Sequence, residues 1–237
     1  AVPSVGGTKG FDVDAVRALR PDLVLANQEE NSRPQVQALI EAGVRVHVSF
    51  PCTVAASNRY LESLSVLLGV EATSEAVRLC EDALTRALAV MPVDPLRVFV
   101  PIWKDPWMTF DGRAYASDLL RVCGAHNVFD DRVRKYPLAA DLGQRAAWDD
   151  ARVAGRDTRY PRVQLDEVIE RGARAVLFPD EPYAFSEIDE EPFAALDTTR
   201  PLWLERVDGK DLFWYGTRVA EAVDRLRTTV KRIQASH

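Results

Sequence analysis

The sequence has few of the residues from which metal sites and disulfide frameworks are built. Its 237 residues include only 3 cysteines and 3 histidines, and no Cys-x-x-Cys pair occurs. An odd number of widely spaced cysteines fits neither a disulfide scaffold nor a structural zinc site. We therefore expect Cys52, Cys80 and Cys123 to be small buried hydrophobic side chains, and we expect no metal site built from the protein's own ligands.

Clustered positive charge and long apolar runs are also scarce. Basic residues number 30 against 36 acidic ones, which gives a net charge of −6, and they form no run. This argues against a nucleic-acid-binding surface, which requires clustered lysine and arginine. The apolar runs are far shorter than the roughly 18 residues that a membrane-spanning helix requires. The composition therefore favours a small molecule or a protein as the partner.

The common catalytic and cofactor-binding motifs are missing as well. The sequence has no GxSxG, no GxGxxG after a strand and no GxxxxGK[ST]. The hydrolase elbow, the dinucleotide loop and the phosphate loop therefore have no basis in this sequence. The stretch from Gly6 to Gly10 resembles a phosphate loop only in composition, and we interpret it as a turn.

What the sequence does contain is an alternation of helix and strand patterns. Residues 12–19 and 32–42 carry apolar side chains at helical spacing. Short apolar runs at 22–26 and 44–50 follow these two segments and are typical of buried strands. The order strand, helix, strand predicts a parallel unit with a right-handed crossover.

Two longer helical patterns come next, at residues 53–68 and 73–91. The second contains neither proline nor glycine, so we expect a straight and rigid helix that lets the regions on either side of it move little. A second α/β unit follows, with a polar segment at 130–159 that we interpret as a surface excursion carrying one short helix. The other predicted elements of this unit are strands at 97–102 and 173–178 and helices at 116–123, 165–171 and 217–233.

Polar and aromatic side chains gather where three predicted strands end, at residues 26, 102 and 178. Open α/β sheets bind ligands at this edge. Large rings on short loops are costly to leave in water, so they contact either the core or a ligand, and both interpretations stay open. The candidate ligand-binding residues are Asn27, Glu29, Trp103, Trp107, Glu181, Tyr183 and Phe185, together with Trp214 and Tyr215 before the last helix.

An ordered set of short segments resembles a known family. The segments are Val5-Gly-Gly-Thr-Lys9, Val16-Arg-Ala-Leu-Arg-Pro-Asp-Leu-Val-Leu-Ala26, Ala42-Gly-Val-Arg-Val46, Arg97-Val-Phe-Val100, Leu119-Leu-Arg-Val-Cys-Gly124 and Asn127-Val-Phe129. They resemble the periplasmic-type cobalamin and ferric-siderophore binding proteins of ABC importers, the helical-backbone metal receptors. The vitamin B12 binding branch is the most similar.

The resemblance implies an α/β fold of two Rossmann-like lobes joined by one long rigid backbone helix, with the ligand in a cleft between the lobes. The lobes would span residues 1–72 and 93–237, and the helical linker residues 73–92. Such proteins usually have a further strand, helix and strand before the Gly-Gly-Thr stretch. The first lobe is therefore expected to be incomplete relative to the family.

The resemblance also implies a function. The protein would be the substrate-binding component of an ABC importer and would capture a corrinoid such as cobalamin without chemistry, with a ferric siderophore or haem as the alternative. The ligand would bring its own metal, so no cofactor is expected. The implied location is the periplasm or cell surface, although no signal peptide is visible and a cytoplasmic location stays open. Carboxylates expected to dock on the permease are Glu30, Glu187, Glu190 and Glu191.

Two hypotheses from other classes compete with this one. An enzyme could use Glu29 or Glu30 with Glu181 as an acid–base pair, because two carboxylates do such work when their surroundings separate their pKa values. The sequence does not give the distance between these side chains. A purely structural or protein-interaction role is the remaining alternative.

Overall fold

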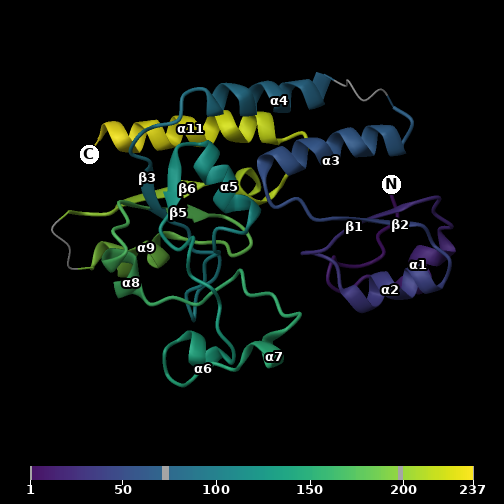
Figure 1. The fold of residues 1–237 in the computed structure, drawn as a ribbon, viewed down its shortest axis with the longest axis horizontal. Coiled ribbons are helices and arrows are strands. Elements are labelled where there is room, and N and C mark those ends of the chain that lie inside the picture. Colours follow the sequence, from purple (N-terminus) through teal and green to yellow (C-terminus); the bar gives the residue numbers. More distant parts are fainter. Residues whose placement is uncertain (1, 71–74, 197–199, 237) are drawn as a thin grey trace. The chain divides into compact units, whose positions relative to one another are not determined.

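The chain forms two compact units, Ala1–Pro51 and Cys52–His237. The computed structural model describes residues 2–70, 75–196 and 200–236 (Figure 1). Residues 52–70, which were predicted to belong to the first lobe, lie in the second unit. In the described ranges, no helix has both the length and the apolar character that a membrane span needs.

The first unit is a small strand, helix, strand unit preceded by a helix, as the sequence predicted. Asp12 caps the first helix, because its side chain accepts hydrogen bonds from the backbone N–H groups of Asp14 and Ala15. The two strands pair in parallel, with Val24 opposite Val46. The elements are α1 (Val13–Ala18), β1 (Val24–Asn27), α2 (Arg33–Glu41) and β2 (Val46–Ser49).

The two-stranded sheet of the first unit buries few apolar side chains. Leu39 is fully covered and Val16 and Ala26 nearly so, but Leu25 and Val48 on the strands keep 48% and 45% of their surface exposed. Parallel sheets are normally covered on both faces, so this unit has a much smaller core than a complete α/β lobe.

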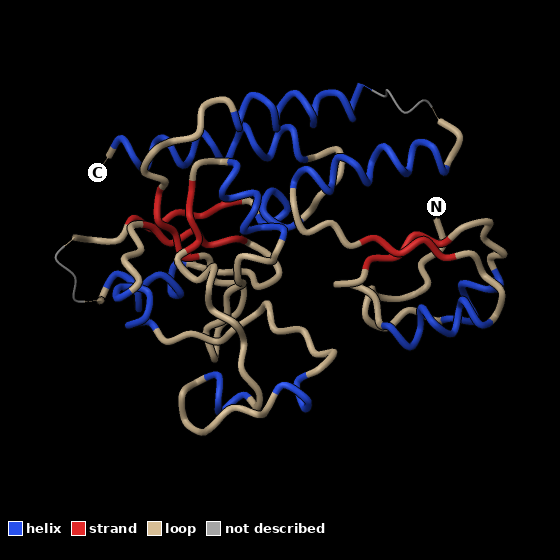
Figure 2. The backbone as a smooth tube through the Cα atoms, in the orientation of Figure 1, coloured by secondary structure: helices blue, strands red, loops and turns tan. Residues whose placement is uncertain are grey.

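The second unit is built on a parallel four-stranded sheet with the order β4-β3-β5-β6, coloured red in Figure 2. Its strands are β3 (Leu96–Phe99), β4 (Ala125–Asn127), β5 (Ala175–Pro179) and β6 (Trp203–Val207). The sequence predicted β3 and β5, which are apolar runs at the centre of the sheet. It missed the edge strands, because β4 has only three residues and β6 contains two adjacent charged residues, Glu205 and Arg206.

Helices cover both faces of this sheet. Val98 and Leu177 point into a core shared with α5 (Tyr115–Val122) and α11 (Val219–Ala235), whereas Phe99, Val176 and Phe178 point into a second core. The second core also contains residues of α8 (Leu165–Glu170) and α9 (Glu187–Ala194). The alternation along each strand follows from the two-residue period of a β-strand.

Helix α4 (Glu75–Leu88) belongs to the second unit, where it packs against α11 and α3 (Val54–Leu67). The prediction of one helix from Thr73 to Met91 was too long at its carboxyl end, and residues 73 and 74 lie outside the described ranges. Val77, Cys80, Ala83 and Ala87 form its buried stripe. A role for this helix as the link between two lobes stays a prediction.

The segment between β4 and α8 contains two short helices, α6 (Leu138–Asp141) and α7 (Asp150–Val153), where the sequence predicted one. The sequence also missed α10 (Gly209–Phe213) and α9. Of the three cysteines expected to be buried, Cys80 and Cys123 are buried and Cys52 is half-buried.

Candidate functional site

Three loops leave the carboxyl ends of β3, β5 and β6, and these ends meet at one edge because the strands are parallel. They carry most of the side chains that the sequence singled out in the second unit. The loop after β3 holds Trp103 and Trp107, and the loop after β5 holds Glu181, Tyr183 and Phe185. The sequence could find these residues because each loop directly follows a strand that reads as an apolar run.

Four of these aromatic rings form one group, which we call the aromatic cluster: Trp103, Trp107, Tyr183 and Phe185. Trp103 meets Tyr183 edge to face with ring centroids 5.3 Å apart, and Tyr183 lies 4.7 Å from Phe185. Trp107 stacks on Phe185 at 5.9 Å and 11°. The structure therefore brings together residues from two loops that lie about eighty positions apart in the sequence.

Exposure differs within the aromatic cluster. Trp107 and Phe185 pack into the second core of the sheet, where Trp107 also meets the buried Phe193 edge to face at 4.9 Å. Trp103 keeps 47% of its surface exposed, and Tyr183 is half-buried. The outer pair of rings can therefore contact a ligand, whereas the inner pair anchors the two loops to the core.

An ion pair that no sequence pattern indicated joins the loop after β3 to helix α9. Lys104 Nζ lies 2.6 Å from Oδ1 of Asp189 on α9, and Asp189 is 3% exposed. The backbone N–H and the hydroxyl of Ser186 donate to its other carboxylate oxygen at 2.8 and 2.9 Å. Burial tends to raise the pKa of Asp189, but the hydrogen bonds from Lys104 and Ser186 outweigh burial and hold that pKa below its ordinary value.

Glu181 lies where β5 and β6 end. Its Oε1 atom is buried and has no hydrogen-bond partner. A Cβ atom on Gly209, the first residue of α10, would lie 2.6 Å from Cγ of Glu181 and 2.7 Å from its carbonyl oxygen. Only glycine allows the start of α10 to come this close, and the approach holds Glu181 at the edge of the sheet.

The two aromatic residues before the last helix lie in different surroundings. Trp214 is 54% exposed, with Nζ of Lys210 lying 5.4 Å from its ring centroid. Tyr215 is half-buried and meets Tyr60 of α3 and Tyr115 of α5 edge to face, each at 5.9 Å. Tyr215 therefore packs against helices α3 and α5.

The candidate residues of the first unit are Asn27, the last residue of β1, and Glu29, which lies in the turn after it. The Asn27 side chain accepts hydrogen bonds from the backbone N–H groups of Glu29 and Glu30 at 2.6 and 3.1 Å. Asn31 closes the turn by accepting from the Asn27 N–H at 2.7 Å. Asn27 is therefore an organiser of this turn, a role that the sequence could have shown from the Asx-turn pattern.

The predicted docking carboxylates are not equivalent. Glu190 accepts a hydrogen bond from Nε of Arg206 at 2.7 Å, whereas Glu187 lies 3.8 Å from the same guanidinium with a side chain 91% exposed. Glu30 and Glu191 are exposed. In the parts of the chain that the structure describes, no three His, Cys, Asp or Glu side chains come together as a metal site would require.

Comparison with curated proteins finds relatives over part of the chain. It is 27% identical over 135 residues to a vitamin B12-binding protein of Vibrio parahaemolyticus, covering 56% of this chain and 49% of that protein. A vitamin B12-binding protein of Vibrio vulnificus is 25% identical over 138 residues. The chain thus spans about half the length of the curated relatives it matches. No protein-family model matches it.

Comparison with solved structures covers nearly the whole chain. The periplasmic vitamin B12 binding protein BtuF of Vibrio cholerae has a TM-score of 0.71 at 18% identity, over 97% of this chain and 82% of that one. The periplasmic haem-binding protein RhuT from Roseiflexus has a TM-score of 0.73 at 15% identity, over 98% and 84%. The chain is thus similar over about half of its length to vitamin B12-binding proteins, and it has the α/β fold of periplasmic vitamin B12 and haem binding proteins. This similarity confirms the resemblance and the α/β fold class.

Proposed function

We propose that this protein is the substrate-binding component of an ABC importer and that it captures a corrinoid without transforming it. The observation that carries the proposal is the aromatic cluster at the carboxyl end of the parallel sheet, in a chain with the fold of periplasmic cobalamin and haem binding proteins. Its relatives are described as binding proteins and not as enzymes.

The exposed rings suit a bulky planar ligand. Trp103 and Tyr183 present ring surface to solvent while Trp107 and Phe185 hold their loops in place, so the binding surface is formed before a ligand arrives. Glu181 adds a buried carboxylate oxygen without a partner. The corrin periphery carries amide N–H donors, and one of them would satisfy this acceptor.

The remaining predicted contacts are part of the same proposal. Asn27 and Glu29 of the first unit, and Trp214 and Tyr215 of the second, stay predicted ligand-binding residues. The exposed Glu30, Glu187 and Glu191 would dock on arginines of the permease, together with Glu190. Transport by a permease requires an extracytoplasmic location, in the periplasm or at the cell surface.

Haem or a ferric siderophore is the second candidate ligand. It is favoured by the solved haem-binding proteins of the same fold, among them BhuT in complex with two haems, which has a TM-score of 0.67 at 18% identity. Both ligand types are chelates that bring their own metal ligands. A protein site poor in histidine and cysteine therefore accommodates either.

Tryptophan fluorescence titrations with cyanocobalamin, haem and several ferric siderophores test the proposal. We expect saturable quenching by a corrinoid at micromolar concentrations. Trp103→Ala should weaken binding by about tenfold or more, since a stacked aromatic contact contributes about 1 kcal/mol beyond its buried area. Trp148→Ala, in the segment between β4 and α8, is the matched control and should leave the affinity unchanged. Quenching by none of the ligands would overturn the proposal.

A further inference from the structure

The segment from residue 131 to 162 extends the edge of the second unit that carries the aromatic cluster. It follows the carboxyl end of β4, which lies at the same edge as the carboxyl end of β3 because the two strands are parallel. It returns beside the loop after β3, where Met108 and Arg162 form an antiparallel bridge. Figure 1 shows its helices α6 and α7 on the side of the second unit opposite to α4 and α11.

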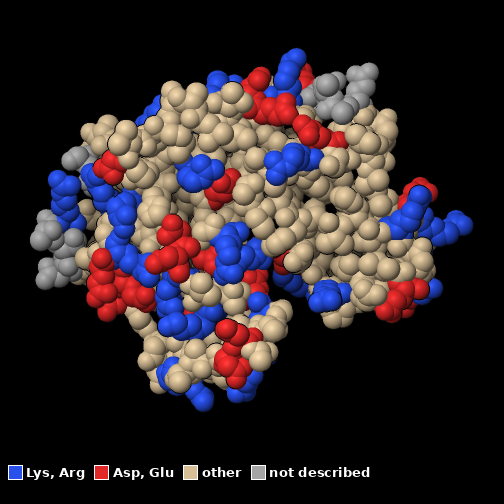
Figure 3. All heavy atoms as spheres, viewed as in Figure 1, with Lys and Arg blue, Asp and Glu red and all other residues tan. Residues whose placement is uncertain are grey.

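Positive charge is concentrated in this segment. It contains eight basic side chains and five acidic ones, whereas the whole chain has a net charge of −6. Figure 3 shows basic side chains at the lower edge of the view, where α6 and α7 lie, with an acidic group beside them. Three of the five acidic side chains are engaged in ion pairs, namely Asp131 with Arg171, Asp141 with Arg132, and Asp157 with Arg159.

Three arginines of the segment gather around two aromatic rings, a group that we call the arginine–aromatic stack. The rings of Tyr136 and Trp148 stack with centroids 6.3 Å apart and planes 14° apart. Arg134 lies over Tyr136 and Arg152 over Trp148, each 4.4 Å from the ring centroid. Arg156 lies 5.2 Å from the first ring and 5.4 Å from the second. A ring attracts a cation but does not neutralise it, so the three charges remain available to a partner.

Backbone contacts hold the arginine–aromatic stack together. The N–H of Trp148 donates to the carbonyl of Tyr136 at 2.7 Å, and the Tyr136 hydroxyl donates to the carbonyl of Asp157 at 2.8 Å. The N–H of Arg134 donates to the carbonyl of Thr158 at 2.9 Å. Three stretches of the segment are thus fixed against each other, and the stack is formed before any partner arrives.

Apolar side chains accompany the exposed arginines. Arg152 and Arg156 are exposed, and neither forms an ion pair in the part of the chain that the structure describes. Val133 and Leu138 of the same segment keep 49% and 46% of their surface exposed. Basic, aromatic and aliphatic side chains on one surface are typical of proteins that lie at a membrane–water interface. An acidic protein would pair with the arginines but gives no reason for the exposed aliphatic side chains.

We propose that the arginine–aromatic stack, together with Val133 and Leu138, contacts the anionic headgroups of a phospholipid membrane. Arg152 and Arg156 bind phosphate oxygens, and the rings and aliphatic side chains lie at the level of the headgroups. The rest of the chain carries the excess of negative charge, so an anionic surface attracts this segment and repels the remainder. The contact turns the edge of the candidate site toward the membrane. That orientation rests on the proposed function, in which a permease receives the ligand, whereas the lipid contact itself does not.

Co-sedimentation of the full chain with phospholipid vesicles tests the proposal. We expect the protein to sediment at low ionic strength with vesicles of phosphatidylglycerol and phosphatidylcholine, but not with vesicles of phosphatidylcholine alone. Sodium chloride above about 0.1 M should weaken this binding, because the Debye length then falls below about 10 Å. Arg152→Gln and Arg156→Gln should each lower the partition coefficient about fivefold.

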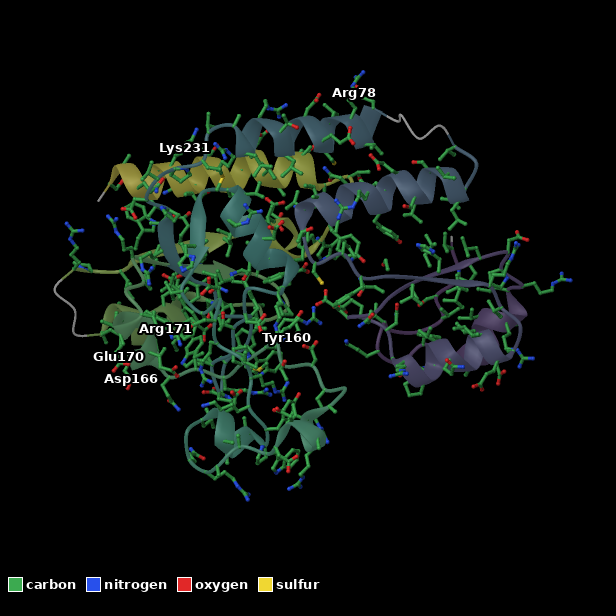
Figure 4. All side chains as sticks on the ribbon, viewed as in Figure 1. Arg78, Tyr160, Asp166, Glu170, Arg171 and Lys231 are labelled. Atoms are coloured by element: carbon green, nitrogen blue, oxygen red, sulfur yellow. The ribbon has the colours of Figure 1, made fainter. Side chains whose placement is uncertain are left out.

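The matched control is the pair Arg78→Gln and Lys231→Gln, on α4 and α11, where both exposed side chains are labelled in Figure 4. This pair removes the same amount of charge from the other side of the second unit and should lower the partition coefficient far less. Equal losses for the two pairs would show that binding follows net charge alone and would overturn the proposal. Absence of binding to the phosphatidylglycerol vesicles would overturn it as well.

Leu138→Gln separates a membrane from an acidic protein as the partner. It should weaken vesicle binding, because it removes an exposed apolar side chain from contact with lipid. If Leu138→Gln has no effect and soluble polyglutamate displaces the protein from the vesicles, the surface recognises an acidic protein and the proposal is wrong. Vesicle binding that depends on Arg152 and Arg156, in a protein that binds no chelate, supports the membrane contact and counts against the proposed function alone.

Discussion

Trp103 and Trp107 are four residues apart in one loop, yet they have different physical roles. Trp107 lies among Phe185 and Phe193 in the second core, whereas almost half of the Trp103 surface is exposed. Burial of aromatic surface contributes to folding only where the ring is removed from water. Trp107 should therefore matter for stability and Trp103 for binding.

Trp107→Ala is expected to lower the free energy of unfolding by about 3 kcal/mol, because it leaves a cavity beside two phenylalanine rings. Trp103→Ala should lower it by about 1 kcal/mol or less, since that ring keeps much of its exposure. Urea unfolding followed by circular dichroism measures both values. Equal losses of stability in the two variants would contradict the division between an inner and an outer pair of rings.

Asp189 should make stability depend on pH. The pKa of Asp189 in the folded state lies below its ordinary value of 3.8. Its contribution to the free energy of unfolding is therefore fully present above the unfolded-state pKa and is lost as pH falls through the folded-state pKa. The pKa of Lys104 is raised because of its hydrogen bond to Asp189. The contribution of Lys104 to stability is therefore lost only when pH rises through that raised pKa.

Asp189→Asn should therefore destabilise the protein at neutral pH and lose its effect in strong acid. Thermal unfolding of both proteins across the acidic range measures the difference. Glu170→Gln on α8, where the exposed side chain is labelled in Figure 4, is the control and should show no such convergence. A constant difference between wild type and Asp189→Asn at every pH would rule out the ion pair.

At the scale of elements, the close approach of α10 to the end of β5 sets the edge of the candidate site. Asp180 accepts the backbone N–H of Gly209 at 2.7 Å, and Asp208 caps α10 through the N–H of Lys210. Arg218 and Arg225 both bind the buried Asp211, which fixes α10 against α11. The loops after β5 and β6 are thus held from both sides.

Gly209→Ala should disturb this junction. The added methyl group would lie under 3.0 Å from backbone atoms of Glu181, so the end of β5 must shift, at a cost of about 1–3 kcal/mol. Differential scanning calorimetry gives the loss of stability. Gly10→Ala, where the added Cβ meets nothing within 4 Å, is the control. A melting temperature for Gly209→Ala equal to that of the control would mean that the junction is loose.

At the scale of the whole molecule, the two units differ in the fraction of their strand residues that is buried. All five residues of β5 are buried, whereas β1 has one buried residue out of four. Local opening costs less where fewer apolar contacts are lost. The first unit is therefore the less stable of the two, if each unit is considered by itself.

Hydrogen exchange should show this difference directly. We expect the backbone amides of β1 and β2 to exchange faster than those of β5 by about two orders of magnitude or more, which corresponds to about 3 kcal/mol in opening free energy. Mass spectrometry of peptic fragments resolves the two regions. Equal protection of the two sheets would show that the first unit is stabilised by more than its own core.

The α/β class, the elements with strong periodicity and the loops after β3 and β5 could all be predicted from the sequence, because the spacing of apolar residues shows which side chains are buried. It could not determine β4 and β6, since short or charged edge strands are stabilised by pairing with their neighbours and not by their own pattern. Which rings of the aromatic cluster are covered, and that Lys104 meets Asp189, became evident only from the folded structure. These contacts join residues far apart in the chain, and no local pattern encodes their distance.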